Sequence, residues 1–172
     1  MTAAPEPLRA IEPLGGHHDV DSFSCGREAL DRFLKRFALV NEKAGSTRTF
    51  VLCRGAHRVV GYYSLTVGSV DPAHVPRRVA KGLARHPIPV MLLARLAVDT
   101  DEQGRGVGSE MLRDALLRTQ RAADHAGIRA GLVHAKDAAA RDWYARYDFE
   151  PSPSDPYHLF MLLKDVRALL GR

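Results

Sequence analysis

The chain has 172 residues, 45% of them hydrophobic and 26% charged, which predicts a single globular domain with a well-formed core. It has no apolar run of about eighteen residues and no basic-then-apolar leader, so we expect a cytoplasmic protein with neither a membrane span nor a secretory signal. Two cysteines are too few for a disulfide framework or a metal cluster and are expected to be buried free thiols, while a net charge of +5 favours an anionic partner or a solvated basic surface.

The first part of the chain predicts an extended segment followed by a helix. Residues 1–16 hold three prolines and few periodic apolar residues, so we expect them to be extended, with residues 8–11 as a candidate edge strand. From Gly26 to Ala38 apolar residues recur at helical spacing, and basic residues fill the opposite side. The small polar residues before this helix suit a cap at its start, and residues 41–46 are expected to end it.

Two β-rich segments and a basic segment come next. Residues 47–54 and 58–70 are rich in Thr, Val, Tyr and Phe, and the turn between them predicts an antiparallel hairpin. Residues 75–86 then carry four cations and no acidic residue, before a proline-rich stop at residues 86–89. Such a run is either a solvated face or a site for an anion.

The second half of the chain alternates strands and helices. The expected elements are a strand at residues 90–98, a helix from Gly108 to Gly127, a buried strand at 128–135, a helix capped by Asp137 and running through Tyr147, a strand at 157–164 and a short helical tail at 165–172. This order predicts one domain over residues 1–172 of the α/β (α+β) class. Its sheet is expected to be mixed and mostly antiparallel, with a βαβ unit at the centre and helices on its faces.

A glycine-rich turn at the centre of that βαβ unit predicts a phosphate cradle. Glycines 104, 106 and 108 precede or open the helix, where the first-turn amides have no partner and the helix dipole favours an anion. The spacing is not that of a nucleoside triphosphate loop, and the third glycine and the later acidic residue of a dinucleotide fold are missing. We therefore expect a pyrophosphate as the ligand; the alternative is a glycine-rich turn without a ligand.

The motif Gln103-Gly104-Arg105-Gly106-Val107-Gly108, after Arg95-Leu96-Ala97-Val98-Asp99, resembles that of the GNAT acetyltransferase superfamily. The resemblance implies that acetyl-CoA is the cosubstrate, with no metal, and that its pantetheine arm lies between two splayed strands. Main-chain amides near the acetyl carbonyl would stabilise the oxyanion that forms there. The residues that the resemblance assigns to acetyl-CoA are Leu96, Ala97, Val98, Gln103, Gly104, Arg105, Gly106, Val107, Gly108 and Ser109.

Tyr144 is the candidate catalytic acid. With Trp143 it occupies the place where many GNAT enzymes carry Phe-Tyr, and a phenol there can protonate the departing thiolate. The alternative is an aromatic ring that only packs against pantetheine. Asp148 stands where a glycine is usual, which puts the local turn in question, although Asp tolerates left-handed geometry. No paired carboxylates flank the site, which mildly favours an α-amine acceptor. His134 could act as a base through water, but because it sits in an apolar run it is expected to be buried and hydrogen-bonded and is given no acid-base role.

The pattern Phe23-x-Cys25-Gly26-x-x-x-Leu30-Asp31-x-Phe33-Leu34 narrows the resemblance to TacT-type toxins, over about residues 23–163. These are GNAT enzymes of toxin-antitoxin modules that acetylate the amino group of aminoacyl-tRNA and so inhibit translation. The family implies a homodimer and silencing by a ribbon-helix-helix antitoxin in a repressor complex. It also gives the basic residues a use, since they would hold tRNA phosphates: Arg27, Lys35, Arg36, Arg77, Arg78, Lys81 and Arg85.

Two other functions stay open from the sequence. A GNAT enzyme that acetylates a small amine or a protein amine would need no tRNA, and its basic face would be incidental. A non-catalytic module that binds acyl-CoA or nucleic acid would keep the glycine cradle but would not need the Tyr144 hydroxyl.

Overall fold

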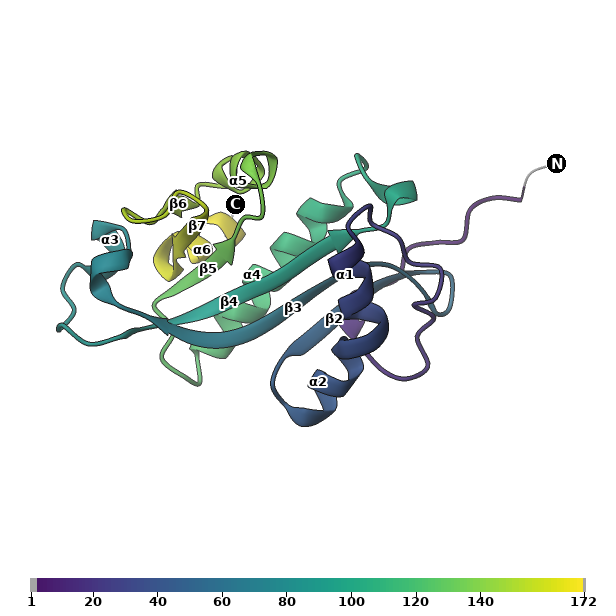
Figure 1. Ribbon diagram of the computed structural model, residues 1–172, viewed down its shortest axis with the longest axis horizontal. Helices are drawn as coiled ribbons and strands as arrows, with labels where there is room; N and C mark the ends of the chain where they lie inside the picture. Colours follow the sequence, from purple (N-terminus) through teal and green to yellow (C-terminus); the bar gives the residue numbers. More distant parts are fainter. Residues whose placement is uncertain (1–2, 172) are drawn as a thin grey trace. The chain divides into compact units, whose positions relative to one another are not determined.

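The computed structural model describes residues 3–171, which form two compact units (Figure 1). Of the described residues, the first unit comprises 3–65 and 95–114, and the second comprises 66–94 and 115–171. Strands β3 (Arg58–Val70) and β4 (Ile88–Val98) and helix α4 (Val107–Ala123) each contribute to both units. The seven strands follow the order β1-β2-β3-β4-β5-β7-β6 in a mixed sheet.

The first unit is built on antiparallel strands. Strands β1 (Glu12–Pro13), β2 (Arg48–Arg54) and β3 pair in that order, with a register shift at Leu52 and Cys53. Figure 1 shows the first helical segment in front of the β2–β3 hairpin. That segment changes winding along its length, since α1 (Glu28–Arg32) passes into a π-helical stretch η1 (Phe33–Phe37) and then into α2 (Ala38–Ala44). The hairpin and this helical segment enclose a core of buried residues: Leu14, Phe23, Cys25, Phe33, Leu34, Ala38, Val51, Cys53, Val59, Tyr62 and Ala97.

The second unit contains the parallel part of the sheet. Strand β4 runs parallel to β5 (Ala130–His134), and β5 pairs antiparallel with β7 (His158–Leu162). The remaining elements of this unit are η2 (Pro72–His74), α3 (Arg77–Ala80), α5 (Ala138–Ala145), β6 (Glu150–Pro151) and α6 (Leu163–Leu170). A second core lies here, made of Val75, Val79, Ile88, Val90, Ala130, Leu132 and Phe160.

The expected fold class is confirmed, as are the hairpin, the central parallel pair and the order of elements. Cys25 and Cys53 are buried free thiols, as expected, and burial raises the pKa of Cys53 to about 11. None of the helices within residues 3–171 is long and apolar enough to cross a membrane.

The expected cap of the first helix is wrong. Arg27 takes the N-cap position, and its side chain makes no capping hydrogen bond. Asp31 instead reaches back from inside the helix, and its Oδ1 accepts a hydrogen bond from the Cys25 N–H at 2.9 Å. A side chain of the helix therefore fixes the preceding segment, whereas we had expected a side chain of that segment to cap the helix.

Several boundaries also differ from the expected ones. Strand β4 begins at Ile88 rather than at residue 90, because Pro89 accepts a hydrogen bond from the Arg129 N–H through its carbonyl and so fits inside the strand. Helix α4 ends at Ala123, ahead of Gly127, in a turn closed by hydrogen bonds of residues 124–126 to Arg121 and Ala122. Only an isolated bridge to Arg54 forms within the expected edge strand at 8–11, and the two-residue strand β6 was not expected. Residues 1, 2 and 172 of the expected terminal segments lie outside the described residues.

Candidate active site

The glycine turn of the first unit has the backbone geometry of an anion cradle. It follows the short helix η3 (Thr100–Glu102) and leads into α4, which begins at Val107. Gly104 has φ 77° and Gly106 has φ 82°, both in the left-handed region that favours glycine. A Cβ atom added at either glycine would meet no atom within 4 Å, so the space in front of the turn is open. Because the first-turn amides of α4 lack intrahelical partners, the cradle fits a pyrophosphate.

The two polar side chains expected in this turn lie differently. Arg105 is exposed, so its guanidinium can reach an anion in the cradle. Gln103 is also exposed, but its Nε2 donates to the carbonyl of Val98 at 2.9 Å and to that of Cys25 at 3.0 Å. Gln103 thus ties the turn to the end of β4 and to the segment before α1. This bracing role was not anticipated from the sequence.

The segment that begins at Phe23 docks against the start of the glycine turn. The Ser24 N–H donates to Asp99 Oδ2 at 3.1 Å, and the Ser24 carbonyl accepts from the Thr100 N–H at 2.9 Å. Asp99 is buried and also caps η3 by accepting from the Asp101 N–H. These bonds fix the backbone on which the cradle is built.

A buried ion pair supports the same turn from β2. Arg54 donates two hydrogen bonds to Glu102, from Nε at 2.7 Å and from Nη2 at 2.8 Å. Glu102 is only 4% exposed, and the hydrogen bonds from Arg54 lower the pKa of its carboxyl group below the usual value. Such two-point pairs fix geometry as well as charge. No local pattern predicts this contact, since 48 residues separate its partners.

The end of β4 carries the expected oxyanion residues Leu96, Ala97 and Val98. Ala97 is buried in the first core, and the Arg95 guanidinium lies 3.6 Å from the centre of the Phe33 ring. This cation–π contact joins the strand end to the π-helical stretch. The strand end is therefore held in place on one face by the first helical segment.

Tyr144 lies in the second unit on α5 and is 8% exposed. Burial raises the pKa of its phenol above the ordinary value, so the phenol remains protonated at neutral pH. Within residues 3–171 the hydroxyl has no hydrogen-bond partner. The centre of the Tyr144 ring lies 5.0 Å from the centre of the Trp143 ring and 5.5 Å from that of the Phe149 ring. A protonated, fixed and unpaired phenol has the properties of a proton donor to a ligand.

The local structure around Tyr144 agrees with two sequence predictions. Asp137 caps α5, because its Oδ1 accepts from the Ala140 N–H at 2.8 Å. Asp148 has φ 69° and is the one non-glycine residue with positive φ in the described chain. The turn that follows α5 therefore forms without the usual glycine.

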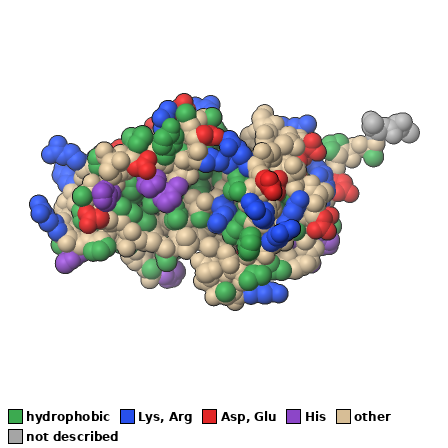
Figure 2. All heavy atoms as spheres, in the orientation of Figure 1, with side chains coloured by type: hydrophobic (Ala, Val, Ile, Leu, Met, Phe, Trp, Pro, Cys, Tyr) green, Lys and Arg blue, Asp and Glu red, His purple; other side chains and the backbone are tan. Residues whose placement is uncertain are grey.

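An open hollow of about 590 Å³ lies in the same unit, over β5 and β7 (Figure 2). Apolar side chains of four strands form much of its wall, and histidine side chains gather beside them. The rings of His134 and His158 stack with their centres 4.1 Å apart and their planes at 19°. His134 is exposed, so the expectation that it is buried and hydrogen-bonded is wrong. The first four residues of β5 are buried, and its last residue, His134, is exposed to solvent.

All seven basic residues expected to hold tRNA are exposed. Arg27, Lys35 and Arg36 belong to the first unit, and the other four belong to the second. Arg78 differs from the rest because its guanidinium lies 2.9 Å from Glu150 and 2.8 Å from Asp165. These two carboxylates neutralise much of its charge. Arg129, which was not anticipated, donates to the carbonyls of Val79 and Lys81 and so holds the basic segment in place.

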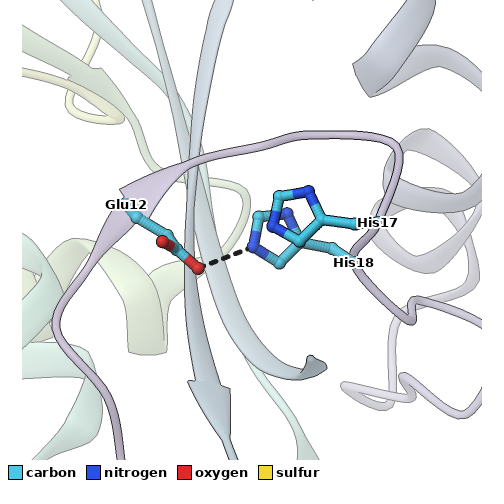
Figure 3. Close-up of side chains that lie close together, drawn as sticks. All are labelled: Glu12, His17 and His18. Carbon is cyan, nitrogen blue, oxygen red and sulfur yellow. Dashed lines mark hydrogen bonds and ion pairs between the residues drawn. The ribbon is translucent and has the colours of Figure 1, made fainter. Parts of the chain in front are cut away.

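Glu12, His17 and His18 place potential metal-binding atoms within 4.8 Å of one another (Figure 3). Both ring nitrogens of His18 are already engaged, because Nδ1 accepts from the Gly15 N–H at 2.9 Å and Nε2 lies 2.8 Å from Glu12. With Nδ1 as the acceptor, Nε2 must carry the proton and donate it to the carboxylate. A metal would need the Nε2 lone pair, so this arrangement is that of a structural hydrogen bond.

Comparison with known proteins relates this geometry to a family. A family model described as an acetyltransferase (GNAT) domain matches residues 45–151. The tRNA-acetylating toxin of Mycobacterium tuberculosis is 54% identical, over 89% of this chain and 91% of that protein. The structure of AtaT complexed with acetyl-methionyl-tRNAfMet has a TM-score of 0.88 and 29% identity, covering 95% of this chain and 99% of that chain. A Tyr-to-Phe mutant of AtaT bound to the C-terminus of the antitoxin AtaR and acetyl-CoA has a TM-score of 0.82 and 28% identity, covering 97% of this chain and 100% of that chain.

Proposed function

The chain belongs to the acetyltransferase (GNAT) family, and we propose that it is a toxin that transfers the acetyl group of acetyl-CoA to the α-amino group of aminoacyl-tRNA. The observation that carries the proposal is the 54% identity to a tRNA-acetylating toxin over nearly the whole chain. An acetylated α-amino group can no longer attack a peptidyl ester, so the reaction would inhibit translation.

The cradle and the strand end supply the acetyl-CoA side of the reaction in this proposal. The amides of residues 104–109 hold the pyrophosphate, and the exposed Arg105 adds a charge-assisted hydrogen bond. Gln103 supports the turn rather than binding the pyrophosphate, because its side-chain Nε2 already donates to two carbonyl groups. Main-chain amides of residues 96–98 stabilise the oxyanion that forms as the amine attacks. Tyr144 then gives its proton to the departing thiolate.

The acceptor side rests on charge. Exposed basic residues hold tRNA phosphates and position the acceptor end without reading its amino acid. Arg78 makes the smallest contribution of the seven, since two carboxylates already hold it. Aminoacyl-tRNA is a cytoplasmic substrate, so the enzyme acts in the cytoplasm. We further propose that the protein forms a homodimer and is silenced by a ribbon-helix-helix antitoxin within a repressor complex; the structure of AtaT with the C-terminus of the antitoxin AtaR supports an antitoxin as partner.

Transfer of labelled acetyl from acetyl-CoA to a total pool of charged tRNA tests this function. Uncharged tRNA, free amino acids and a lysine-rich protein serve as alternative acceptors in parallel reactions. We expect label only on charged tRNA, and mild hydrolysis of the ester then identifies the acetylated amino acid. Label on the free amines or on the protein, with none on tRNA, would identify a different acceptor, and failure to bind acetyl-CoA would overturn the enzymatic reading.

A further inference from the structure

His134 stands where the two central strands separate. The parallel pairing of β4 with β5 runs from Val90 and Ala130 to Leu93 and Val133, and it stops there. β4 continues to Val98, whereas β5 ends at His134, one residue beyond the last pair. Because side chains alternate along a strand, His134 shares a face with Leu132, and both line the open hollow of the second unit.

The hollow has the size and the lining of a pocket for a small ester-linked group. Its volume of about 590 Å³ lies within the range of ligand sites. Its wall includes Val90, Leu92, Leu132 and Phe160, which would face the carbon atoms of a ligand. Apart from Ser69 and His74, its polar and titratable groups gather at the ends of β5 and β7 and in the loop before β7. A ligand with an apolar body and one basic group fits that division.

The histidine pair at this end of the hollow can accept one proton. The imidazole rings stack face to face, so protonation of both would place two positive charges about 4 Å apart. Behind them, His158 Nε2 lies 3.4 Å from Asp155 Oδ2. One proton taken by the pair is thus stabilised by a carboxylate, and a second is opposed by the first.

The surroundings of His134 are otherwise free of titratable groups on the strands. Among the described residues that line the hollow, the titratable ones are His74, His134, Asp155 and His158. His74 is engaged with Ser154 through a 2.8 Å hydrogen bond, and the parts of β3 and β4 that reach the hollow contribute only glycine, serine and apolar residues. Desolvation, followed by the charge of His158, lowers the pKa of His134, and Asp155 opposes this shift. The imidazole is therefore neutral at pH 7 and able to accept a proton.

We propose that His134 is the base that takes a proton from the α-ammonium group of the acceptor, with His158 and Asp155 as positioning residues behind it. This inference rests on the proposed transfer of acetyl to aminoacyl-tRNA. His134 ends β5 and Tyr144 lies on α5, which begins four residues later, so the base and the acid come from consecutive elements of one unit. The sequence contained both residues, but not the register that stacks His134 on His158.

The proposed step moves one proton from the acceptor amine to His134 and one from Tyr144 to the leaving group. The ammonium nitrogen gives one proton to His134, and its lone pair then forms the bond to the acetyl carbon. The carbon–sulfur bond breaks, and the thiolate takes the proton of Tyr144. The second proton on the new amide nitrogen returns to the Tyr144 phenolate, so that one proton remains on the histidine pair and leaves to solvent. The products are the acetylated aminoacyl ester and free coenzyme A.

The test is the pH dependence of kcat/KM for charged tRNA in the wild type and in His134→Gln, with acetyl-CoA saturating. Loss of a general base is expected to lower the rate about 100-fold at pH 7. The wild-type rate should fall only as the pH drops through the pKa of His134, which lies below the usual histidine value, whereas the variant should lose rate below about pH 7.7–8.0, where the acceptor amine itself becomes protonated. His134→Ala should regain activity when imidazole is added, which a purely structural role would not allow.

Matched controls separate this proposal from the function on which it rests. His125→Gln removes an exposed histidine in the turn just after α4 and should keep the wild-type rate and pH profile. Acetyl-CoA binding by His134→Gln should equal that of the wild type. If the wild type acetylates charged tRNA and His134→Gln keeps its rate and pH profile, the base assignment is wrong while the function stands. If the wild type leaves charged tRNA unlabelled, the function itself has failed.

Discussion

Replacing Tyr144 by phenylalanine removes one hydroxyl and leaves the packing of α5 intact. The hydroxyl has no protein partner within the described residues, so Tyr144→Phe breaks no hydrogen bond, and the free energy of unfolding should change by less than about 1 kcal/mol. The ring contacts with Trp143 and Phe149 are kept. Any large effect on the reaction would therefore come from the lost proton.

The size of that effect follows from the leaving group. A positioned general acid contributes roughly 10²–10⁴-fold, which corresponds to about 2.7–5.4 kcal/mol of transition-state stabilisation. Because burial raises the pKa of the phenol, Tyr144 stays protonated up to at least about pH 10, and the wild-type rate should show no decline from this group at lower pH. The variant should lose kcat by that factor at every pH, with unchanged affinity for acetyl-CoA.

Single-turnover transfer of labelled acetyl to charged tRNA measures kcat, and isothermal titration with acetyl-CoA measures binding. Tyr147→Phe is the matched control, since it removes a phenol just past the end of the same helix and should leave the rate unchanged. A rate for Tyr144→Phe within threefold of wild type would refute the acid assignment. An equal loss of acetyl-CoA affinity and of rate would instead identify Tyr144 as a packing residue.

Three further perturbations address the cradle, its support and the tRNA surface. Gly106→Val places a branched residue at φ 82° inside the cradle, so the KM for acetyl-CoA should rise about tenfold, as measured by steady-state kinetics. Glu102→Gln should lower the free energy of unfolding at pH 7 by about 1.5–3 kcal/mol in urea titrations. Because the folded-state pKa of Glu102 is depressed, its contribution is present above about pH 4.3 and is lost as the pH falls through the folded value, so wild type and variant should converge in acid. Replacing Arg77, Lys81 and Arg85 together by glutamine should weaken tRNA binding and reduce the slope of log K against log salt by about 2–3.

Controls of the same chemistry make each outcome decisive. Gly45→Val carries similar strain at φ 74° outside the cradle. If this variant raised the KM for acetyl-CoA as much as Gly106→Val does, the assignment of the cradle to acetyl-CoA would be wrong. Convergence of the Glu102 variant with the wild type at high pH rather than in acid would contradict the assigned pKa direction. Neutralising Arg113, Arg121 and Lys164 removes three exposed cations elsewhere. If it reduced the salt slope equally, the basic segment would have no special part in binding.

The sequence predicted features whose cause is local. The hairpin follows from two β-rich runs around a short turn, and the Asp137 cap from one side chain three residues before the amide that it accepts from. The cradle follows from glycines whose left-handed backbone few other residues adopt. Asp148 was correctly allowed in place of glycine for the same reason. In each case the residues that decide the geometry are neighbours in the chain.

Features that depend on distant partners were missed. His134 reads as buried because it ends an apolar run, and only its register with His158 across β5 and β7 brings the rings together at the surface. Arg78 reads as one cation in a basic run, yet its two carboxylates come from residues 72 and 87 positions away. The π-helical stretch at Phe33–Phe37 was also hidden, because its five residues continue an amphipathic pattern that an α-helix would give.

The pattern from Phe23 to Leu34 supports the glycine turn, through bonds of the segment before α1 to Asp99 and Thr100. The bonds to Asp99 and Thr100 are made by the backbone of Ser24, which any residue except proline could supply. The residues of the pattern position that backbone. Phe23 anchors the segment in the first core, and Gly26 takes φ 86° where the chain turns into α1. Asp31 then secures the turn through the Cys25 N–H. A motif far from the glycines in sequence therefore shapes the loop that carries them.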